Sequence, residues 1–229
     1  MFYNKSKLLF CIIVLLFMAG LSFTIAQNKN SKYRMLYNSD GTDIMGNYFY
    51  GNKPITVDEV KSYVDRVTGT PVTTFLICTG ALSPYHRSKY DRAFGDGEDV
   101  RLVKRLNERT EDSAQTAMMR IYKTNWKILD DQKTDIVEIC VNRAKEKGLE
   151  AFITIRMNDL HFTDTAEYFP SVKSEFWLNH PEYWMGDHPG WHSGGAYNFA
   201  HKGVRDYKLN LIKEECEKFN IDGIELDFM

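Results

Sequence analysis

The sequence predicts an α/β protein built on a parallel β-sheet. Short apolar segments alternate with longer amphipathic segments along the chain, and this alternation is typical of βαβ units. The clearest unit comes last, where the amphipathic segment 204–219 leads into the apolar segment 220–229. A helix that delivers the chain to a mostly buried strand is the connection that parallel strands require, so we expect a parallel sheet.

Local signals support the first three elements. Residues 33–37 form a short apolar run that predicts the first strand. Thr56 and Glu59 have the spacing of a capping box, which predicts a helix that continues to about residue 67. Residues 72–79 are β-branched and apolar enough to form a buried strand.

Two more helices and a third strand are expected in the middle of the chain. The helices are predicted at 113–129 and 134–147, and Gly148 stands where a helix C-cap glycine belongs. The apolar segment 149–157 then predicts a strand. Residues 161–203 have little periodicity and many aromatic side chains, which is typical of a functional loop and argues against disorder.

Two architectures fit this order of elements: a (β/α)8 barrel and an open doubly wound sheet. No G-x-G-x-x-G turn follows the first strand, which removes the main nucleotide-binding reason to prefer the open sheet. Polar side chains gather at the carboxyl ends of the last two strands, where barrel enzymes build their active sites. These side chains belong to Thr154, Arg156, Asn158, Glu225 and Asp227. We therefore favour the barrel.

The number of strands is half of what a barrel requires. A complete barrel needs eight strands over about 250 residues, whereas the 229 residues of this sequence show four. A half barrel would leave a bare sheet edge and uncovered apolar faces. We therefore expect about the first four βα units of a (β/α)8 barrel, in an N-terminal fragment of a longer protein.

Composition narrows the classes of partner. The formal net charge of −2 gives no electrostatic footprint for nucleic acid or anionic membranes, so neither is an expected partner. Aromatic residues make up 14% of the chain. Aromatic side chains often line sites that bind ring-shaped ligands, although most of them could equally belong to the core.

The N-terminus reads as a secretory signal peptide. Lys5 and Lys7 precede the apolar run 8–20, and a softer stretch then leads to Ala26, after which we expect cleavage. An uncleaved anchor is the alternative, because the apolar stretch is nearly long enough to span a bilayer. We therefore assign residues 1–26 to the signal peptide and 27–229 to the barrel half, and we expect a secreted or periplasmic protein without stable membrane insertion.

Three cysteines remain after the signal segment. Cys78, Cys140 and Cys216 each lie in an apolar strand or helix pattern, so buried free thiols are the expectation. At most one disulfide is possible among them, and the sequence does not identify it.

The final strand carries two carboxylates on one face. Because strand side chains alternate, Glu225 and Asp227 share a face with Gly223, whereas Ile224, Leu226 and Phe228 share the other. An ordinary surface strand could also place charge on one face. Carboxylates on an interior strand are costly unless they pair, bind a ligand or take part in chemistry.

Three segments resemble a known family. They read I-D-G-I-E-L-D-F-M at 221–229, I-R-M-N-D-L-H at 155–161 and A-Y-N-F-A-H at 196–201. Together they resemble the first half of the bacterial secreted barrels called glycosyl-hydrolase-like family ten. This resemblance implies a TIM-barrel glycosidase, or a close relative, that acts on an extracellular polysaccharide or oligosaccharide.

The resemblance also suggests catalytic roles. Asp227, last on the strand, would be the nucleophile or charge stabiliser. Glu225 would lie deeper, as the acid/base or as a structural partner of Arg156. Glycoside hydrolysis generally needs two carboxyl groups, and Cα atoms two strand positions apart lie roughly 6.6 Å from each other, which does not separate retention from inversion. A second catalytic carboxylate beyond residue 229 remains an open alternative.

Further side chains at the strand ends and in the long loop are expected to bind sugar. Carboxylate, amide and imidazole groups suit sugar hydroxyls, and aromatic faces suit the apolar faces of sugar rings. The alternative for each of them is a capping or packing role. The expected substrate-binding residues are Arg156, Asn158, Asp159, His161, Trp184, Trp191, His192 and Asn198.

Other chemistries have less support. Five of the six histidines fall between residues 161 and 201, and Asp187, His188 and His192 could ligate a metal, but no H-E-x-x-H spacing occurs. No G-x-S-x-G elbow is present. We therefore expect no metal and no cofactor. The alternatives to a glycosidase are a carbohydrate-binding barrel without catalysis and a metal-dependent hydrolase.

Overall fold

The computed structural model describes residues 33–46, 53–96, 113–161, 173–186 and 193–228. The chain forms two compact units, Met1–Arg34 and Met35–Met229. The signal peptide predicted at 1–26 lies outside the described residues, and every element below belongs to the second unit.

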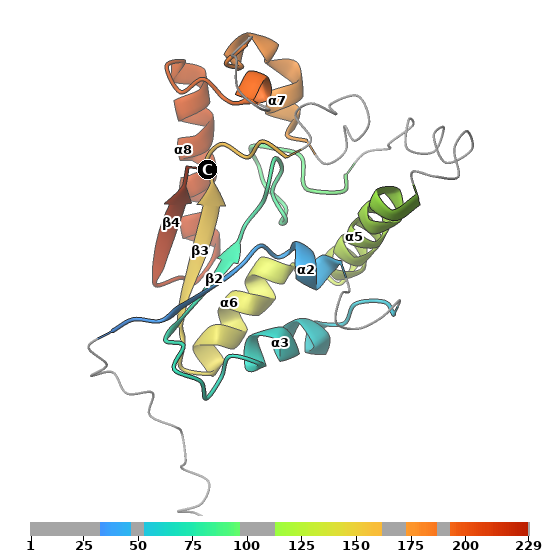
Figure 1. Cartoon of the computed structure of the whole chain (residues 1–229), viewed down its shortest axis with the longest axis vertical. Helices are drawn as coiled ribbons and strands as arrows, with labels where there is room; N and C mark the ends of the chain where they lie inside the picture. The colour runs from blue at the N-terminus through green and yellow to red at the C-terminus, as the bar shows by residue number, and fades with distance from the viewer. Residues whose placement is uncertain (1–32, 47–52, 97–112, 162–172, 187–192, 229) are drawn as a thin grey trace, which may run out of the picture. The chain divides into compact units, whose positions relative to one another are not determined.

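The described residues form one four-stranded sheet. Its strands are β1 (Leu36–Ser39), β2 (Thr74–Cys78), β3 (Glu150–Arg156) and β4 (Gly223–Asp227). All neighbouring pairs are parallel, in the order β1-β2-β3-β4 (Figure 1). The predicted α/β class with a parallel sheet is therefore confirmed, whereas closure into a (β/α)8 barrel stays a prediction.

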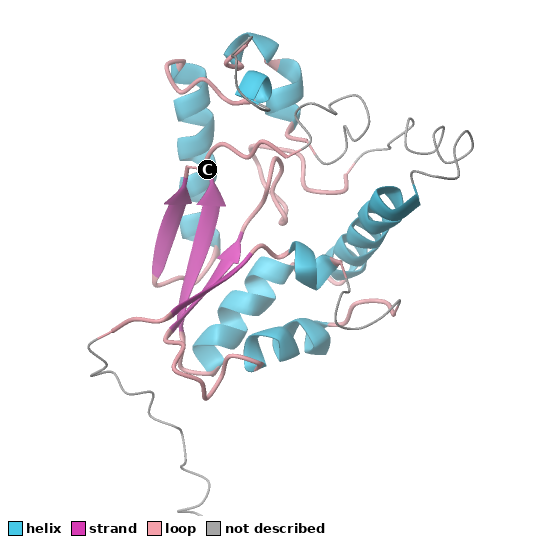
Figure 2. Cartoon of the chain, in the orientation of Figure 1, coloured by secondary structure: helices cyan, strands magenta, loops and turns pink. Residues whose placement is uncertain are grey.

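Helices and strands alternate along most of the chain, and Figure 2 shows the helices flanking the sheet. They are α2 (Thr42–Met45), α3 (Val57–Asp65), α5 (Ser113–Asp131), α6 (Ile136–Glu146), α7 (Glu175–Asn179) and α8 (Lys202–Lys218), with short 3-10 turns at Pro181–Tyr183 and Ser193–Gly195. The predicted capping box opens α3: Glu59 N donates to Thr56 Oγ1 at 3.2 Å, and Thr56 N donates to Glu59 Oε2 at 2.8 Å. Gly148 follows α6 with a φ of 77°, as a C-cap glycine should.

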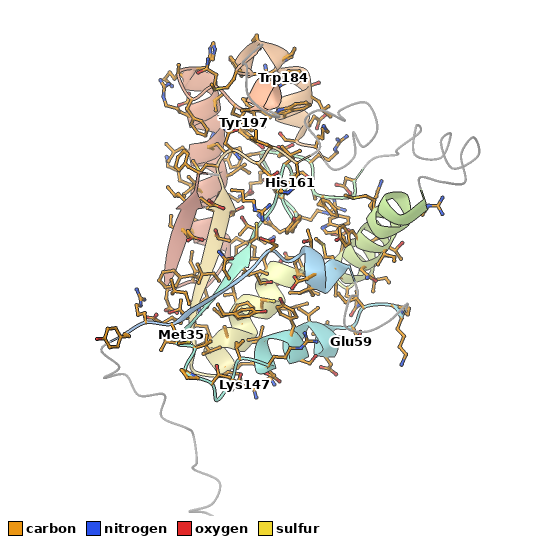
Figure 3. The ribbon with its side chains drawn as sticks, viewed as in Figure 1. Met35, Glu59, Lys147, His161, Trp184 and Tyr197 are labelled. Carbon is orange, nitrogen blue, oxygen red and sulfur yellow. The ribbon has the colours of Figure 1, made fainter. Side chains whose placement is uncertain are left out.

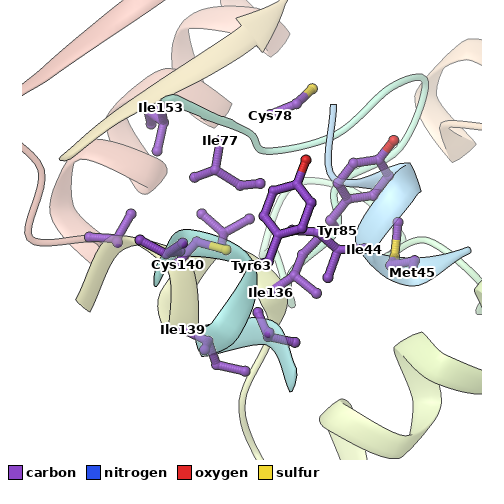
Figure 4. Packing of buried hydrophobic residues seen from close by; sticks show 14 of the residues in the cluster. Ile44, Met45, Tyr63, Ile77, Cys78, Tyr85, Ile136, Ile139, Cys140 and Ile153 are labelled. Carbon is purple, nitrogen blue, oxygen red and sulfur yellow. The ribbon is translucent and has the colours of Figure 1, made fainter. Parts of the chain in front are cut away.

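The main hydrophobic core lies between one face of the sheet and the helices α3 and α6 (Figure 4). Phe75 and Ile77 of β2 and Ile153 of β3 point into it and are at most 1% exposed. The helices contribute Val60, Val64, Val137, Cys140 and Ala144. Leu76 of β2 and Phe152 of β3 lie on the opposite face, so the two inner strands carry apolar side chains on both faces and read as nearly unbroken hydrophobic runs.

The other face of the sheet is concave and carries polar side chains towards its carboxyl edge. Asn38 of β1 donates from Nδ2 to Glu225 Oε2 of β4 at 3.2 Å, although two strands lie between them. In a flat sheet, three spacings of about 4.8 Å would separate these strands by roughly 14 Å, farther than the two side chains can reach. The sheet therefore curls around this face, in the sense that a barrel requires.

The expectation that the last strand is mostly buried is wrong for this structure. Ile224, Leu226 and Phe228 are 37%, 42% and 64% exposed. They face the same side as the core residues of β3, because Ile153 pairs with Ile224 in the parallel register. In the described part of the chain β4 is an edge strand, and α6 packs on β2 and β3, so this apolar row remains accessible.

The cysteine expectation holds for two of three residues. Cys78 and Cys140 are buried free thiols, but Cys216 is a free thiol exposed on α8. The buried side of α8 instead carries Tyr207, Leu211 and Glu215. Among the helices of the described residues, none has the length and apolarity needed to cross a bilayer.

Gly80, at the end of β2, permits a close approach of the backbone. An added Cβ would lie 2.5 Å from the carbonyl oxygen of Ser83, which cannot move without moving the loop. We expect Gly80→Ala to lower the free energy of unfolding by about 3 kcal/mol, measured by urea denaturation.

Gly223→Ala is the matched control. Its added Cβ would meet only the far edge of the Phe152 ring, at 2.5 Å, and a ring can tilt away. The expected loss is about 1 kcal/mol and should shrink in a Phe152→Leu background. An equal loss for both glycine variants would contradict the close approach at Gly80.

Candidate active site

Polar residues from three strands meet at the carboxyl edge of the sheet. Because the strands are parallel, their carboxyl ends lie at one edge, where α/β proteins usually bind ligands. The register pairs Arg156 of β3 with Asp227 of β4, and Thr154 with Glu225. The sequence-based assignment of these side chains to one face is therefore confirmed.

Arg156 is the centre of this group. Its Nη2 donates to Asp40 Oδ1 at 2.5 Å, just beyond β1, and its Nη1 donates to Asp159 Oδ2 at 2.8 Å. Only 13% of the Arg156 side chain is exposed. Burial alone would lower the pKa of the guanidinium, but the hydrogen bond and charge of Asp159 raise it overall, so Arg156 stays cationic.

Asp159 joins Arg156 to His161. Asp159 Oδ1 accepts from the backbone N of His161 at 2.7 Å and lies 2.8 Å from its ring Nδ1. Burial opposes ionisation of Asp159, yet the hydrogen bonds from His161 and Arg156 prevail and lower its pKa to about 2. The same hydrogen bond to Asp159 raises the pKa of His161. Asp159 is therefore ionised above about pH 2, and its charge favours the protonated form of His161.

A cavity of about 190 Å³ opens beside this group. Asp40, Thr42, Arg156 and His161 are its polar lining residues, and the other lining side chains are aromatic or aliphatic. The cavity is lined by residues that follow β1, β2 and β3 and by side chains of α5.

The two carboxylates of β4 have different surroundings. Glu225 Oε2 accepts from Thr154 Oγ1 at 2.6 Å and from Asn38 Nδ2 at 3.2 Å. The suggested ion pair of Glu225 with Arg156 is wrong here, because Arg156 is occupied by Asp40 and Asp159. Within the described residues the Asp227 side chain has no hydrogen bond, while its backbone carbonyl accepts from Met157 N at 2.8 Å.

Lys208 of α8 forms a hydrogen bond to the backbone at the carboxyl end of β3. Its Nζ donates to the carbonyl oxygen of Arg156 at 3.1 Å and lies 5.3 Å from the Tyr197 ring centre and 5.8 Å from that of Tyr207. Burial lowers the pKa of Lys208 to about 8. A buried amine in this position fixes the backbone that carries the Arg156 side chain.

The long loop packs beyond the strand ends, where Figure 3 places Tyr197 and Trp184. Asn158 Oδ1 accepts from Tyr197 N at 2.8 Å, which ties the loop to β3. Trp184 stacks on Trp177 with ring centres 4.1 Å apart and donates to its carbonyl oxygen at 3.1 Å. Asn198 Oδ1 accepts from Ala200 N at 3.0 Å and holds a turn.

These contacts show packing or capping roles for Asn158, Trp184 and Asn198, the alternative that the sequence left open. Sugar contact by any of them stays a prediction. Trp191 and His192 lie outside the described residues, as do Asp187 and His188 of the metal alternative. Among the residues that the structure does describe, no group of three potential metal ligands comes together.

Sequence reasoning missed Asp40, Asn38, Tyr85 and Lys208. Asp40 and Asn38 end the first strand in a stretch already notable for its carboxylates and amides, so their position at a strand end was the available signal. No such signal exists in the sequence for Tyr85 and Lys208, because their roles depend on contacts with distant segments.

Comparisons with known proteins identify no family. No protein-family model matches the sequence, and no curated protein matches it. A maltogenic alpha-amylase from Thermotoga neapolitana aligns with a TM-score of 0.46 and 13% identity, over 85% of this chain and 38% of the amylase chain. A bacterial fucosidase aligns with a TM-score of 0.40 and 12% identity, over 85% and 38%. The chain thus spans well under half the length of these two solved structures.

The Asp159–His161 pair should give the fold a pH optimum. The pKa of Asp159 falls from 3.8 to about 2 on folding, so its stabilisation is complete above about pH 4 and is lost as the pH falls towards 2. The pKa of His161 is raised above 6.5, so its stabilisation is complete below that pH and is lost as the pH rises through the higher value. We expect this pair to stabilise most between these limits.

Urea denaturation across this pH range would test the assignment. Asp159→Asn should lose about 2 kcal/mol near pH 5 and flatten both limbs of the profile. His161→Gln should flatten the limb above pH 6.5 and should also reduce the acid limb, though less than Asp159→Asn does, because the His161 ring is one of the groups that lower the pKa of Asp159. Asp206→Asn, which changes an exposed carboxylate of α8, serves as the control. A profile unchanged by Asp159→Asn would show that the pair does not govern the pH dependence.

Proposed function

We propose that this chain carries strand-end carboxylates of a secreted glycoside hydrolase that acts on an extracellular polysaccharide or oligosaccharide. The observation that carries the proposal is the position of Glu225 and Asp227 on the concave face of a parallel sheet, next to Arg156. The family resemblance of residues 221–229 gives the reaction class. The chain spans 38% of the length of the two solved structures, so the activity of a whole protein is part of the proposal.

The surroundings of the carboxylates favour separate roles. Asp227 ends its strand without a side-chain partner among the described residues, so its carboxylate is available to a sugar C1 atom as nucleophile or charge stabiliser. Glu225 is held by Thr154 and Asn38, which gives it a fixed orientation. A carboxylate with a fixed orientation suits a role as acid/base or as a positioning group for the substrate.

Export is part of the proposal and rests on the sequence alone. The basic residues Lys5 and Lys7, followed by an apolar run that ends near Ala26, have the order of a signal peptide. A polymer outside the cell is a substrate that only an exported hydrolase could reach.

A carbohydrate-binding barrel without catalysis is the second candidate. Three of the four carboxylates at this edge are already engaged: Asp40 by Arg156, Asp159 by Arg156 and His161, and Glu225 by its two hydrogen-bond donors. Only Asp227 lacks a partner within the described residues. Glycoside hydrolysis generally uses two carboxyl groups, so this count favours binding as the alternative.

Hydrolysis by the full chain should depend on Asp227. We expect Asp227→Asn to reduce the release of reducing ends from a panel of polysaccharides by at least about a thousandfold, because a nucleophile or charge stabiliser is lost. Thermal melting should be unchanged within a few degrees, since the Asp227 side chain has no partner to lose among the described residues.

Asp206→Asn on α8 is the matched control and should leave hydrolysis unchanged. Equal turnover by wild type and Asp227→Asn would refute the catalytic role of Asp227. Glycan binding without turnover by the wild-type chain would select the second candidate.

A further inference from the structure

The cavity at the ends of β1, β2 and β3 has the size of one ring. Its volume is about 190 Å³. Sites for drug-sized ligands usually measure about 300–1,000 Å³. The cavity therefore suits a single ring-sized unit with its substituents.

The inner wall of the cavity is apolar and rigid. Tyr85, Phe94 and Tyr122 line it and are 1%, 4% and 6% exposed. Tyr85 and Phe94 meet edge to face, with ring centres 5.3 Å apart. A ligand that enters must therefore offer an apolar face to this wall.

Tyr85 adds one polar group to that wall. Its ring lies in the core cluster, as Figure 4 shows, and its hydroxyl makes no hydrogen bond to any residue that the structure describes. Burial raises the pKa of this hydroxyl well above its ordinary value, so it stays protonated. It can therefore donate a hydrogen bond to an oxygen atom of a ligand in the cavity.

The charges on the polar side are already balanced. Arg156 directs both of its terminal nitrogens to Asp40 and Asp159, and His161 is paired with Asp159. Asp40 is the exposed member, with 63% of its side chain accessible. An anionic ligand would meet the Asp40 carboxylate and would have to displace it from Arg156.

We propose that this cavity binds one ring of an uncharged sugar and discriminates against the corresponding uronic acid. The aromatic wall faces the apolar side of the ring, the Tyr85 hydroxyl donates to a sugar oxygen, and Asp40 and His161 bind hydroxyl groups. Arg156 lies in the cavity wall and is the register partner of Asp227, which does not itself line the cavity, so the bound ring occupies a subsite one strand away from that carboxylate. This inference rests on the proposed function and names its substrate class.

Matched pairs of monosaccharides test the discrimination on the full chain. Methyl hexosides and the corresponding methyl uronides differ only in a hydroxymethyl or carboxylate group. Titration followed by amide chemical shifts should show binding of at least one hexoside, with at least about tenfold weaker binding of its uronide at pH 7. Binding of no hexoside at tens of millimolar, or tighter binding of the uronide, would overturn the proposal.

Asp40→Asn should relax the discrimination. Removing this charge weakens the ion pair that competes for Arg156, so the ratio of uronide affinity to hexoside affinity should rise about tenfold. Glu217→Gln, which removes an exposed charge on α8, is the control and should not change the ratio. An unchanged ratio in Asp40→Asn would show that Asp40 is not the selecting charge.

Ala81→Leu separates this inference from the proposed function. Ala81 lines the cavity, and a leucine there would occupy space that the ring needs, whereas Ala81→Ser would not. Hexoside binding lost in Ala81→Leu but kept in Ala81→Ser supports the cavity even if no hydrolysis occurs. Binding kept in a folded Ala81→Leu would refute the cavity, whatever the result for Asp227→Asn.

Discussion

The two-sided ion pair of Arg156 organises the carboxyl edge of the sheet. One guanidinium binds Asp40 after β1 and Asp159 after β3, and the backbone carbonyl of the same residue accepts from Lys208 of α8. A largely buried cation needs such partners, because its desolvation is otherwise unfavourable by several kcal/mol. Three segments that are far apart in sequence are thereby joined at one edge of the sheet, and the raised pKa of His161 follows from the same network.

The elements with strong local signals were predictable. The capping box at Thr56 and Glu59, the glycine after α6 and the β-branched run of β2 specify their structures within a few residues. The helices α2 and α7, with four and five residues, are too short to show a helical period. The exposure of β4 was mispredicted, because an apolar strand reads the same at an edge as in the middle of a sheet.

Sequence analysis could place site residues together only when they lie on the same strand. Because alternate side chains of a strand share a face, Arg156 was placed on the same face as Thr154, and Glu225 on the same face as Asp227. The parallel register of β3 and β4 then brings the two pairs together. The ion pair of Arg156 with Asp40 and the hydrogen bond of Glu225 with Asn38 were missed, because both join residues more than 100 positions apart. Such contacts depend on how the sheet curls, which local patterns do not encode.

The exposed Cys216 gives the molecule a natural attachment point. Burial raises the pKa of Cys78 to about 12 and raises that of Cys140 as well, so both thiols are protected from alkylation. Cys216 lies on the solvent side of α8, and partial burial with the neighbouring Glu215 and Glu217 raises its pKa too. Mildly alkaline maleimide chemistry would therefore place a fluorophore on the helix that carries Lys208, and changes at the end of β3 could be followed without introducing a cysteine.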